Sequence, residues 1–293
     1  MFSNNRAVSE VSPAQKTRRR ARWLAALVLL FGATAARAAT ISPNTGSLGS
    51  AADGTHSGNV TSGPGAVVAG SDLSAVYDGV SGTKTTVPYL PALNPPAASP
   101  FTVEFWANPT ASDNDDSPVS NRISSGDRSG WVFFQRPEAT GWNFRMYNGV
   151  GGGLGWDLTG GTSPLNQWTH VAATWDGTAA KLYVNGDLVD EANDPQATGV
   201  YNASSAANFI VAMTDSGSPY AGSVDEAAFY GTALAPLTIL NHFNAASTPV
   251  AEAYHNLVRV DGALLLLSNN AVPEPSAMVL LGAGAALLLR RRS

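Results

Sequence analysis

Short runs of alternating apolar and polar residues, separated by turn residues, recur through the middle of this 293-residue chain. Successive side chains of a strand point to opposite faces of its sheet, so each such run predicts a half-buried β-strand. In residues 101–107 one face carries Phe101, Val103, Phe105 and Ala107. Similar runs, or short continuous apolar ones, predict strands at 131–135, 142–147, 169–175, 181–184, 208–213 and 223–230.

A turn and a single short helix complete the pattern. The pair Asn185-Gly186 separates the run 181–184 from the apolar residues Leu188 and Val189. Both central positions of a type I′ turn need a positive φ, which Asn and Gly tolerate, so this pair predicts a β-hairpin. Only residues 236–244 have a helical pattern. Many short strands joined by turns predict an all-β fold in which two antiparallel sheets pack face to face.

The N-terminal residues have the three parts of a secretory signal peptide. A basic cluster at 18–22 precedes an apolar stretch at 23–36, and Ala36 and Ala38 form a small-residue cleavage motif. We therefore expect residues 1–38 to be removed on export and the mature chain to begin at Ala39 or Thr40.

The C-terminal segment 272–293 also has three parts. A polar element comes first, an apolar run at 277–289 follows, and a basic cluster ends the chain. The apolar run has 13 residues, fewer than the ~20 that a helix needs to cross a bilayer, and the terminal arginines favour the cytoplasmic side. The polar and basic elements consist of Pro273, Glu274 and Pro275, and of Arg290, Arg291 and Arg292.

This tail resembles the PEP-CTERM sorting signal of exported bacterial proteins. The resemblance implies export, transient insertion of the tail into the inner membrane, and its removal by an exosortase-type processing enzyme. The protein would then reach the cell surface or the extracellular matrix. A C-terminal anchor that is never cut is the main alternative. A buried core helix is disfavoured by the terminal arginines and by Gly282 and Gly284.

The body of the chain is strongly acidic. Residues 39–272 contain 20 acidic residues against 7 lysines and arginines, which leaves a net charge of −13. Such a charge repels nucleic acid and anionic lipid, so no nucleic-acid partner is expected. The chain has no cysteine, which excludes disulfides and thiolate metal sites.

Four motifs in the body carry a family resemblance. They lie at 101–109, 166–177, 181–186 and 220–230, and together they resemble the laminin-G-like, concanavalin A-like domain. The resemblance covers about 70–246 and implies a jelly-roll sandwich of two antiparallel sheets. The expected organisation is a signal peptide at 1–38, an entry segment at 39–69, the laminin-G-like domain at 70–246, a segment at 247–271 and the sorting signal at 272–293. Residues 254–267 resemble the opening of a further repeat cut short; a linker or an edge strand that packs back on the sandwich is preferred for 247–271.

The resemblance also implies a metal. Many relatives hold one near motifs that match Asp78-Gly79 and the sequence around Asp225, which makes Asp78 and Asp225 candidate ligands of Ca²⁺. Ca²⁺ takes six to eight oxygen ligands, often from loops. The alternative is that Asp78 caps a turn and that Asp225 accepts hydrogen bonds from the backbone of a neighbouring loop. The acidic loop 113–116 does not match the EF-hand pattern.

No arrangement of residues predicts catalysis. Retaining glycoside hydrolases need two carboxyl groups about 5–5.5 Å apart. Glu104 is the only acidic residue of its predicted strand, and Asp225 and Glu226 are adjacent, so we expect them to point to opposite faces. His170 is expected to have a structural role. We therefore predict no catalytic residues and a protein that is not an enzyme.

One tryptophan is a candidate ligand platform. Trp156 lies in a glycine-rich stretch, 151–161, where an exposed indole ring would stack on a sugar; a core position is an equal alternative. The favoured function is a surface or matrix module that binds carbohydrate or protein, and the PEP-CTERM resemblance implies an association with biofilm. A structural surface protein without a discrete ligand is the alternative, and a glycoside hydrolase is a distant third.

The tail supports a direct prediction about processing. We expect the mature protein to end at about Glu274, because the processing enzyme would remove the apolar run and the basic cluster. Intact-mass measurement of the protein released at the cell surface tests this. Retention of Arg290–Arg292 in that protein would contradict it.

Overall fold

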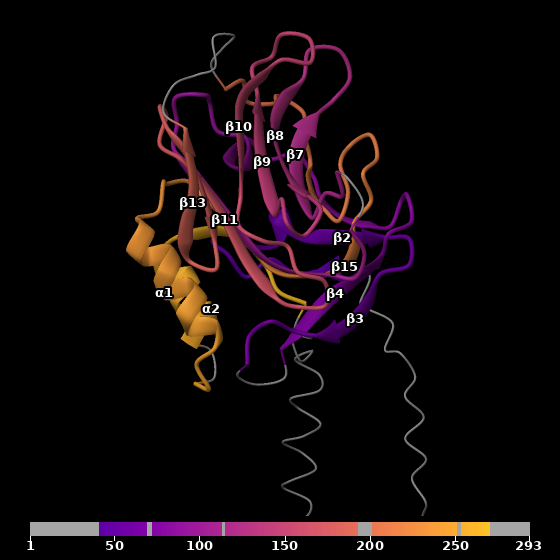
Figure 1. Ribbon diagram of the computed structural model, residues 1–293, viewed down its shortest axis with the longest axis vertical. Coiled ribbons are helices and arrows are strands. Elements are labelled where there is room, and N and C mark those ends of the chain that lie inside the picture. The colour runs from indigo at the N-terminus through magenta and orange to yellow at the C-terminus, as the bar shows by residue number, and fades with distance from the viewer. Residues whose placement is uncertain (1–40, 69–71, 113–114, 193–200, 251–252, 270–293) are drawn as a thin grey trace, which may run out of the picture. The chain divides into compact units, whose positions relative to one another are not determined.

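The structure is a computed structural model that describes residues 41–68, 72–112, 115–192, 201–250 and 253–269 (Figure 1). The expected signal peptide, the sorting signal and its residues therefore lie outside the described residues. Two antiparallel sheets pack face to face, which confirms the predicted all-β jelly-roll sandwich. No helix in the described part of the chain is long and apolar enough to cross a membrane.

The first sheet, which we call the covered sheet, has the strand order β13-β12-β11-β6-β15-β4-β3, and β16 also pairs with β15. Its strands are β3 (Thr61–Pro64), β4 (Leu73–Asp78), β6 (Phe101–Pro109), β11 (Thr169–Trp175), β12 (Ala180–Val184), β13 (Asp187–Ala192), β15 (Ala221–Tyr230) and β16 (Ala263–Leu267). The second, which we call the open sheet, has the order β1-β2-β5-β14-β7-β8-β9-β10. Its strands are β1 (Ile41–Ser42), β2 (Gly54–Ser57), β5 (Lys84–Val87), β7 (Val119–Ile123), β8 (Ser129–Gln135), β9 (Trp142–Tyr147), β10 (Leu154–Gly160) and β14 (Phe209–Val211).

Aromatic side chains fill the space between the sheets. The apolar face predicted for 101–107 is confirmed, since its four members are completely buried in this core. Phe105 of β6 meets Phe133 of β8 edge-to-face with ring centroids 5.0 Å apart, and Phe101 stacks on Phe229 at 5.7 Å. Each such pair adds about 0.5–1.5 kcal/mol beyond the burial of its area. The alternation read from the sequence therefore joins the two sheets.

The local signals for the hairpin and the helix are also confirmed. Asn185 and Gly186 have φ values of 52° and 82° and connect β12 to β13, as a type I′ turn requires. The predicted helix is α1 (Pro236–Ala246), with its proline in the first turn, where the missing N–H costs nothing.

The sandwich extends beyond the resemblance at both ends. The entry segment supplies β1, β2 and β3 to the two sheets. The segment 247–271 contains a second helix, α2 (Ala253–Val260), and β16, which pairs antiparallel with β15. This segment is therefore the edge-strand alternative rather than a linker. β16 satisfies backbone groups of β15 that β4 is too short to reach.

Two helices cover the outer face of the covered sheet, where α1 and α2 lie beside β11 and β13 in Figure 1. Trp106 on this face stacks on Phe243 of α1 with ring centroids 5.8 Å apart. Tyr254 and Val258 of α2 are fully buried in the same cluster. The side chains of β6 that point away from the core between the sheets are therefore also buried, although alternation alone predicts that they face solvent.

Glu104 lies in this second interior with three polar partners. His242 Nδ1 is 2.9 Å from Glu104 Oε1, His170 Nε2 is 3.3 Å from Oε2, and Tyr230 donates a hydrogen bond to Oε1. His242 Nε2 is also 2.9 Å from the Asp261 carboxylate, which follows α2. Glu104 is the only acidic residue of its strand, and the sequence contains no sign of this network, because its five members come from five separate segments.

The network shifts the pKa values of its members. Burial acts to raise the pKa of Glu104, but the charge of His242 and the hydrogen bonds from both histidines outweigh it, so that the pKa lies well below its ordinary value. Burial acts to lower the pKa of His242, but Glu104 and then Asp261 outweigh it and raise that pKa. The pair is therefore ionised in the folded protein, and it fastens α1 to β6.

We predict that Glu104→Gln lowers the free energy of unfolding by about 3 kcal/mol, because it removes the buried counter-charge of the His242 imidazolium and leaves only the partly exposed Asp261 carboxylate. Because the pKa of Glu104 is lowered on folding, its ionisation stabilises the folded protein above the ordinary value of 4.5, and this stabilisation is lost as the pH falls. Because the pKa of His242 is raised on folding, its protonation stabilises the folded protein below the ordinary value of 6.5, and this stabilisation is lost as the pH rises. The difference between wild type and variant should thus be largest between these values.

Denaturant melts at several pH values measure this. Glu191→Gln is the control, since Glu191 forms an exposed ion pair with Lys181 and should change stability by less than about 1 kcal/mol. Equal, small effects of the two substitutions would show that the Glu104 network does not fasten α1.

Candidate functional site

The two aspartates predicted as metal ligands are not brought together. Asp78 is exposed at the end of β4, where its Oδ1 accepts a 3.0 Å hydrogen bond from the Val80 amide. Burial acts to raise its pKa, but this hydrogen bond and those from Thr83 and Asn59 outweigh it and lower the pKa. Asp78 therefore caps a turn, which was the alternative considered from the sequence.

Asp225 lies inside β15 and is only 1% exposed. Its Oδ2 accepts a 2.9 Å hydrogen bond from the Ala66 amide. β15 pairs with β4 so that Ala221 faces Asp78, which places Asp225 four residues, or about 13 Å, farther along the strand. One ion cannot contact both aspartates, so the expectation of a shared site is wrong.

The expectation that Asp225 and Glu226 point to opposite faces is also wrong, because a β-bulge interrupts β15 here. Asp225 is paired with Trp106, yet Ala228 is paired with Glu104, so β15 has one residue more than β6 in this interval. Glu226 has a φ of 49°. Val224 and Ala227 both belong to the core between the sheets, and the two carboxylates lie between them. A bulge breaks the period of two on which the prediction rested.

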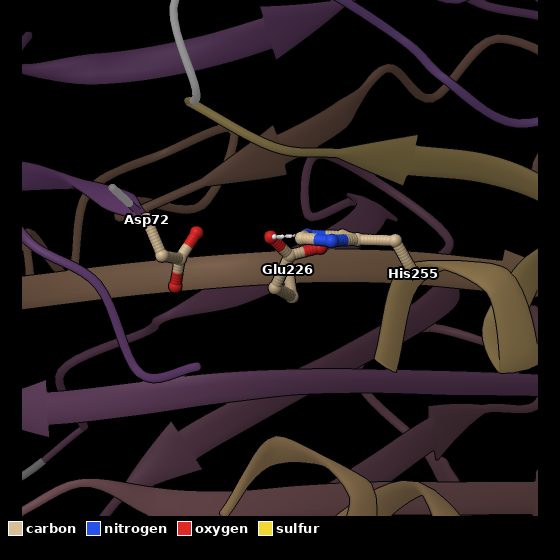
Figure 2. Close-up of side chains that lie close together, drawn as sticks. All are labelled: Asp72, Glu226 and His255. Carbon is tan, nitrogen blue, oxygen red and sulfur yellow. Dashed lines mark hydrogen bonds and ion pairs between the residues drawn. The ribbon is translucent and has the colours of Figure 1, made fainter. Parts of the chain in front are cut away.

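The bulge brings two buried acidic side chains, the half-buried Asp72 and one histidine together. Asp72, Glu226 and His255 each offer one potential ligand atom, and these atoms all lie within 4.8 Å of one another. Figure 2 shows Glu226 between the other two, with His255 Nε2 2.8 Å from Glu226 Oε1. The side chain of Asp225 is hydrogen-bonded to that of Asp72. We call Asp72, Asp225, Glu226 and His255 the carboxylate cluster.

Backbone approaches this cluster closely at Gly65. A Cβ atom on Gly65 would lie 2.0 Å from Asp72 Oδ2 and 2.9 Å from Asp225 Oδ2. The amides that follow it bind the same two oxygens, since Val67 donates to Asp72 Oδ2 and Ala66 to Asp225 Oδ2. A side chain at position 65 would displace the Asp72 carboxylate, and the entry segment thereby forms one wall of the cluster.

Two buried carboxyl groups, those of Asp225 and Glu226, and the half-buried carboxyl group of Asp72 face one imidazole, so the cluster needs protons or a cation. Burial, followed by the charges of Glu226 and Asp72, raises the pKa of Asp225 well above its ordinary value. Burial also raises the pKa of Glu226, although the hydrogen bond and charge of His255 act in the opposite direction. Among the described residues, Glu226 Oε2 is buried and has no hydrogen-bond partner.

The donor set can hold a divalent cation. Carboxylate oxygens suit Ca²⁺, whereas an imidazole nitrogen suits Mn²⁺ or Zn²⁺. Of the four residues, only Asp225 was selected from the sequence. Asp72, Glu226 and His255 were missed, because a bulge, a loop and α2 bring them together and none of these has a signature in the one-dimensional pattern.

Trp156 is not an exposed platform. It is 1% exposed, and its ring lies against Trp175 with centroids 5.3 Å apart in the core between the sheets. The residues around it form β10 rather than a loop, and the pairing of β10 with β9 shifts register between Leu154 and Trp156. Trp156 is buried because it occupies a position of β10 whose side chain points into the core between the sheets.

The open sheet has a polar hollow on its outer face. Its volume is about 480 Å³, within the usual range for ligand sites. The row of paired residues Ser120, Val132, Arg145 and Asp157 crosses β7, β8, β9 and β10 near it. We call it the arginine hollow, lined by Asp115, Arg122, Ser124, Ser125, Arg128, Phe134, Arg145, Tyr147, Ser216 and Ser218.

Guanidinium groups cover the aromatic rings at the base of this hollow. The Cζ atoms of Arg122 and Arg145 lie 5.6 Å from the centre of the Phe134 ring. Arg128 Cζ lies 5.9 Å from the centre of the Tyr147 ring. The rings themselves are only 3% and 1% exposed. The hollow therefore presents guanidinium and hydroxyl groups and the Asp115 carboxylate, which is paired with Arg136, and it does not present aromatic faces.

Comparisons with known proteins agree with the fold. The family model described as the concanavalin A-like lectin/glucanases superfamily matches residues 79–240, and the PEP-CTERM protein-sorting motif matches residues 271–293. Both resemblances inferred from the sequence are thereby confirmed. No curated protein matches the chain.

Two solved structures are similar to the chain. Domain 4 of AbnA, a GH43 extracellular arabinanase from Geobacillus stearothermophilus, in complex with arabinotriose, is 18% identical with a TM-score of 0.52, over 70% of this chain and 98% of that one. The binding domain of Paraclostridial Mosquitocidal Protein 1 is 16% identical with a TM-score of 0.52, over 70% of this chain and 52% of that one. At these identities the likeness shows the fold alone.

The carboxylate cluster leads to a prediction about cations. We propose that a divalent cation binds there, and we expect Ca²⁺, Mn²⁺ or Zn²⁺ to raise the melting temperature relative to EDTA. At a cation concentration 100 times the Kd the gain is about 2.7 kcal/mol, or roughly 5–10 °C for a domain of this size. Glu226→Gln should abolish the difference between cation and EDTA.

Asp78→Asn is the matched control, because Asp78 lies outside the cluster and should leave the cation effect unchanged. Identical melting curves in EDTA and in all three cations would remove the proposal. Loss of the effect in Asp78→Asn with retention in Glu226→Gln would place the cation at the turn after β4 instead.

Proposed function

The chain belongs to the concanavalin A-like lectin/glucanases superfamily, and from that premise we propose that its sandwich is a non-catalytic module that binds carbohydrate outside the cell. The observation that carries the proposal is the arginine hollow on the open sheet. Helices cover part of the outer face of the other sheet, whereas the hollow lies on the face of the open sheet, where it is accessible. Concavity with a few convergent polar groups is the usual property of a ligand site.

The similar solved structures support carbohydrate as the ligand class. The AbnA domain is described in complex with arabinotriose, and it is similar to this chain over almost all of its own length. The chain spans only about half of the mosquitocidal protein's binding domain, which therefore adds less. A shared fold does not settle a shared ligand, so the proposal depends on the hollow of this chain.

The sorting motif indicates an exported protein that is sorted through the membrane. We propose that an exosortase-type enzyme processes the tail and that the mature module acts at the cell surface or in the extracellular matrix. The acidic body suits this location, since its net charge of −13 favours solubility and disfavours non-specific adhesion to anionic lipid.

The positions of the carboxylates support a binding role over hydrolysis. Glu104 and Glu226 are completely buried, and Asp225 is 1% exposed. None of the three lines the arginine hollow. General acid and base groups must reach the glycosidic bond, and these groups are enclosed by α1, α2 and the entry segment.

A glycan-binding screen of the exported protein tests the proposal. We expect at least one polysaccharide to bind saturably and Ser216→Trp, at the exposed rim of the hollow, to weaken binding about tenfold or more. Ser50→Trp is the matched control, an exposed serine that does not line the hollow. A folded protein that binds no glycan would favour the alternative of a structural surface protein.

A further inference from the structure

We propose that the arginine hollow selects acidic glycans, polymers whose sugars carry carboxylate or sulfate groups, and that Arg128 and Arg145 bind these groups. The inference rests on the proposed function and names its ligand class. Residues 39–272 contain only 7 lysines and arginines. Three of them line this one hollow, and Arg136 covers the same Phe134 ring at 5.2 Å. Because basic side chains are so few in this acidic body, their clustering on one face of one sheet is not expected from composition alone.

Two of these arginines have their donors occupied within the protein. Arg122 is 7% exposed and donates to the Tyr147 hydroxyl at 2.7 Å and to Thr214 at 3.2 Å, and its Nε is 3.3 Å from Asp215. Arg136 pairs with Asp115 and donates to the Asn143 side chain at 3.1 Å. These two shape the hollow and have little capacity left for a ligand.

The other two arginines retain donors. Arg145 pairs with Asp157 through Nε at 3.1 Å, and in the described part of the chain its two Nη groups have no hydrogen bond, so their four N–H donors are available. Arg128 is exposed and forms no ion pair with any described residue. A guanidinium fork matches a planar carboxylate, and also a sulfate, with two parallel hydrogen bonds.

The rest of the lining matches a sugar. Ser125 and Ser216 are exposed at the hollow, and their hydroxyls can both donate to and accept from sugar hydroxyls. The rings of Phe134 and Tyr147 lie beneath the arginines, so recognition by aromatic stacking is not available. A ligand with one anionic group among many hydroxyls satisfies guanidinium and hydroxyl donors together.

The charge of the body restricts the anion further. Nucleic acid carries a charge on every nucleotide and needs an extended basic surface, which a body with a net charge of −13 lacks. A glycan with about one acidic group per repeat places only a few negative charges at the hollow. Its neutral hydroxyl groups then face the acidic protein surface around the hollow, where further negative charges would be repelled. An acidic peptide offers the same carboxylates without the hydroxyls, and it serves as a competing outcome of the test.

Titration calorimetry of the exported protein compares four probes: polygalacturonate, its methyl-esterified form, dextran sulfate and polyglutamate. We expect an acidic glycan to bind at least tenfold more tightly than the esterified polymer and polyglutamate, with an affinity that falls as salt increases. The double variant Arg128→Gln, Arg145→Gln should lose that preference. Polygalacturonate and dextran sulfate separate carboxylate from sulfate as the recognised group.

The control is the double variant Lys84→Gln, Lys181→Gln, which removes two positive charges that do not line the hollow and should leave binding unchanged. A melting curve of each variant verifies that it folds. If the glutamine double variant does not fold, the double variant Arg128→Lys, Arg145→Lys replaces it, because it keeps both positive charges. Equal binding of neutral and acidic glycans would overturn the inference while the proposed function stands. Tighter binding of polyglutamate would overturn the glycan class, and binding of no glycan would overturn both.

Discussion

The mismatch in length between β15 and its neighbour β4 is the constraint on which the rest of the structure depends. β15 has ten residues and β4 has six, so β4 can pair with only the first part of β15. The free backbone groups of the remaining part must be satisfied, and β16 satisfies them after the chain has passed through α1 and α2. The two helices therefore pack on the outer face of the sheet and bury the outer side of β6. Glu104 lies on that side, and because it is buried there it is paired with two histidines and a tyrosine.

The change of partner along β15 also explains the carboxylate cluster. Asp225 and Glu226 lie between the last residue paired with β4 and the first paired with β16. A bulge there directs two adjacent carboxylates to one place, and Gly65 and α2 enclose them with Asp72 and His255. Such a concentration of buried charge costs stability unless protons or a cation compensate it. The cluster is thus a consequence of how the covered sheet is closed, which suits a structural cation better than an exposed ligand.

The two outer faces of the sandwich have therefore become different. Helices and buried ion pairs stabilise the covered sheet, while the open sheet keeps its polar surface accessible and gathers arginines over Phe134 and Tyr147. This division separates the groups that hold the fold together from those of the proposed binding site. It also explains why the strongly shifted carboxylates lie away from the proposed site, although perturbed pKa values often mark functional sites.

The sequence by itself determined the all-β class, the inward face of β6, the hairpin at Asn185-Gly186, helix α1 and the C-terminal sorting motif, because each depends on a local period or a short motif. Tertiary structure alone decided that Trp156 is buried, that Asp78 and Asp225 are about 13 Å apart, and that Asp72 and His255 meet Glu226. A bulge of one residue reverses every face assignment that follows it, and a period-based prediction cannot see it. The arginine hollow was hidden for a related reason: Arg122, Arg128 and Arg145 are separated along the chain and become neighbours only through the register of β7, β8 and β9.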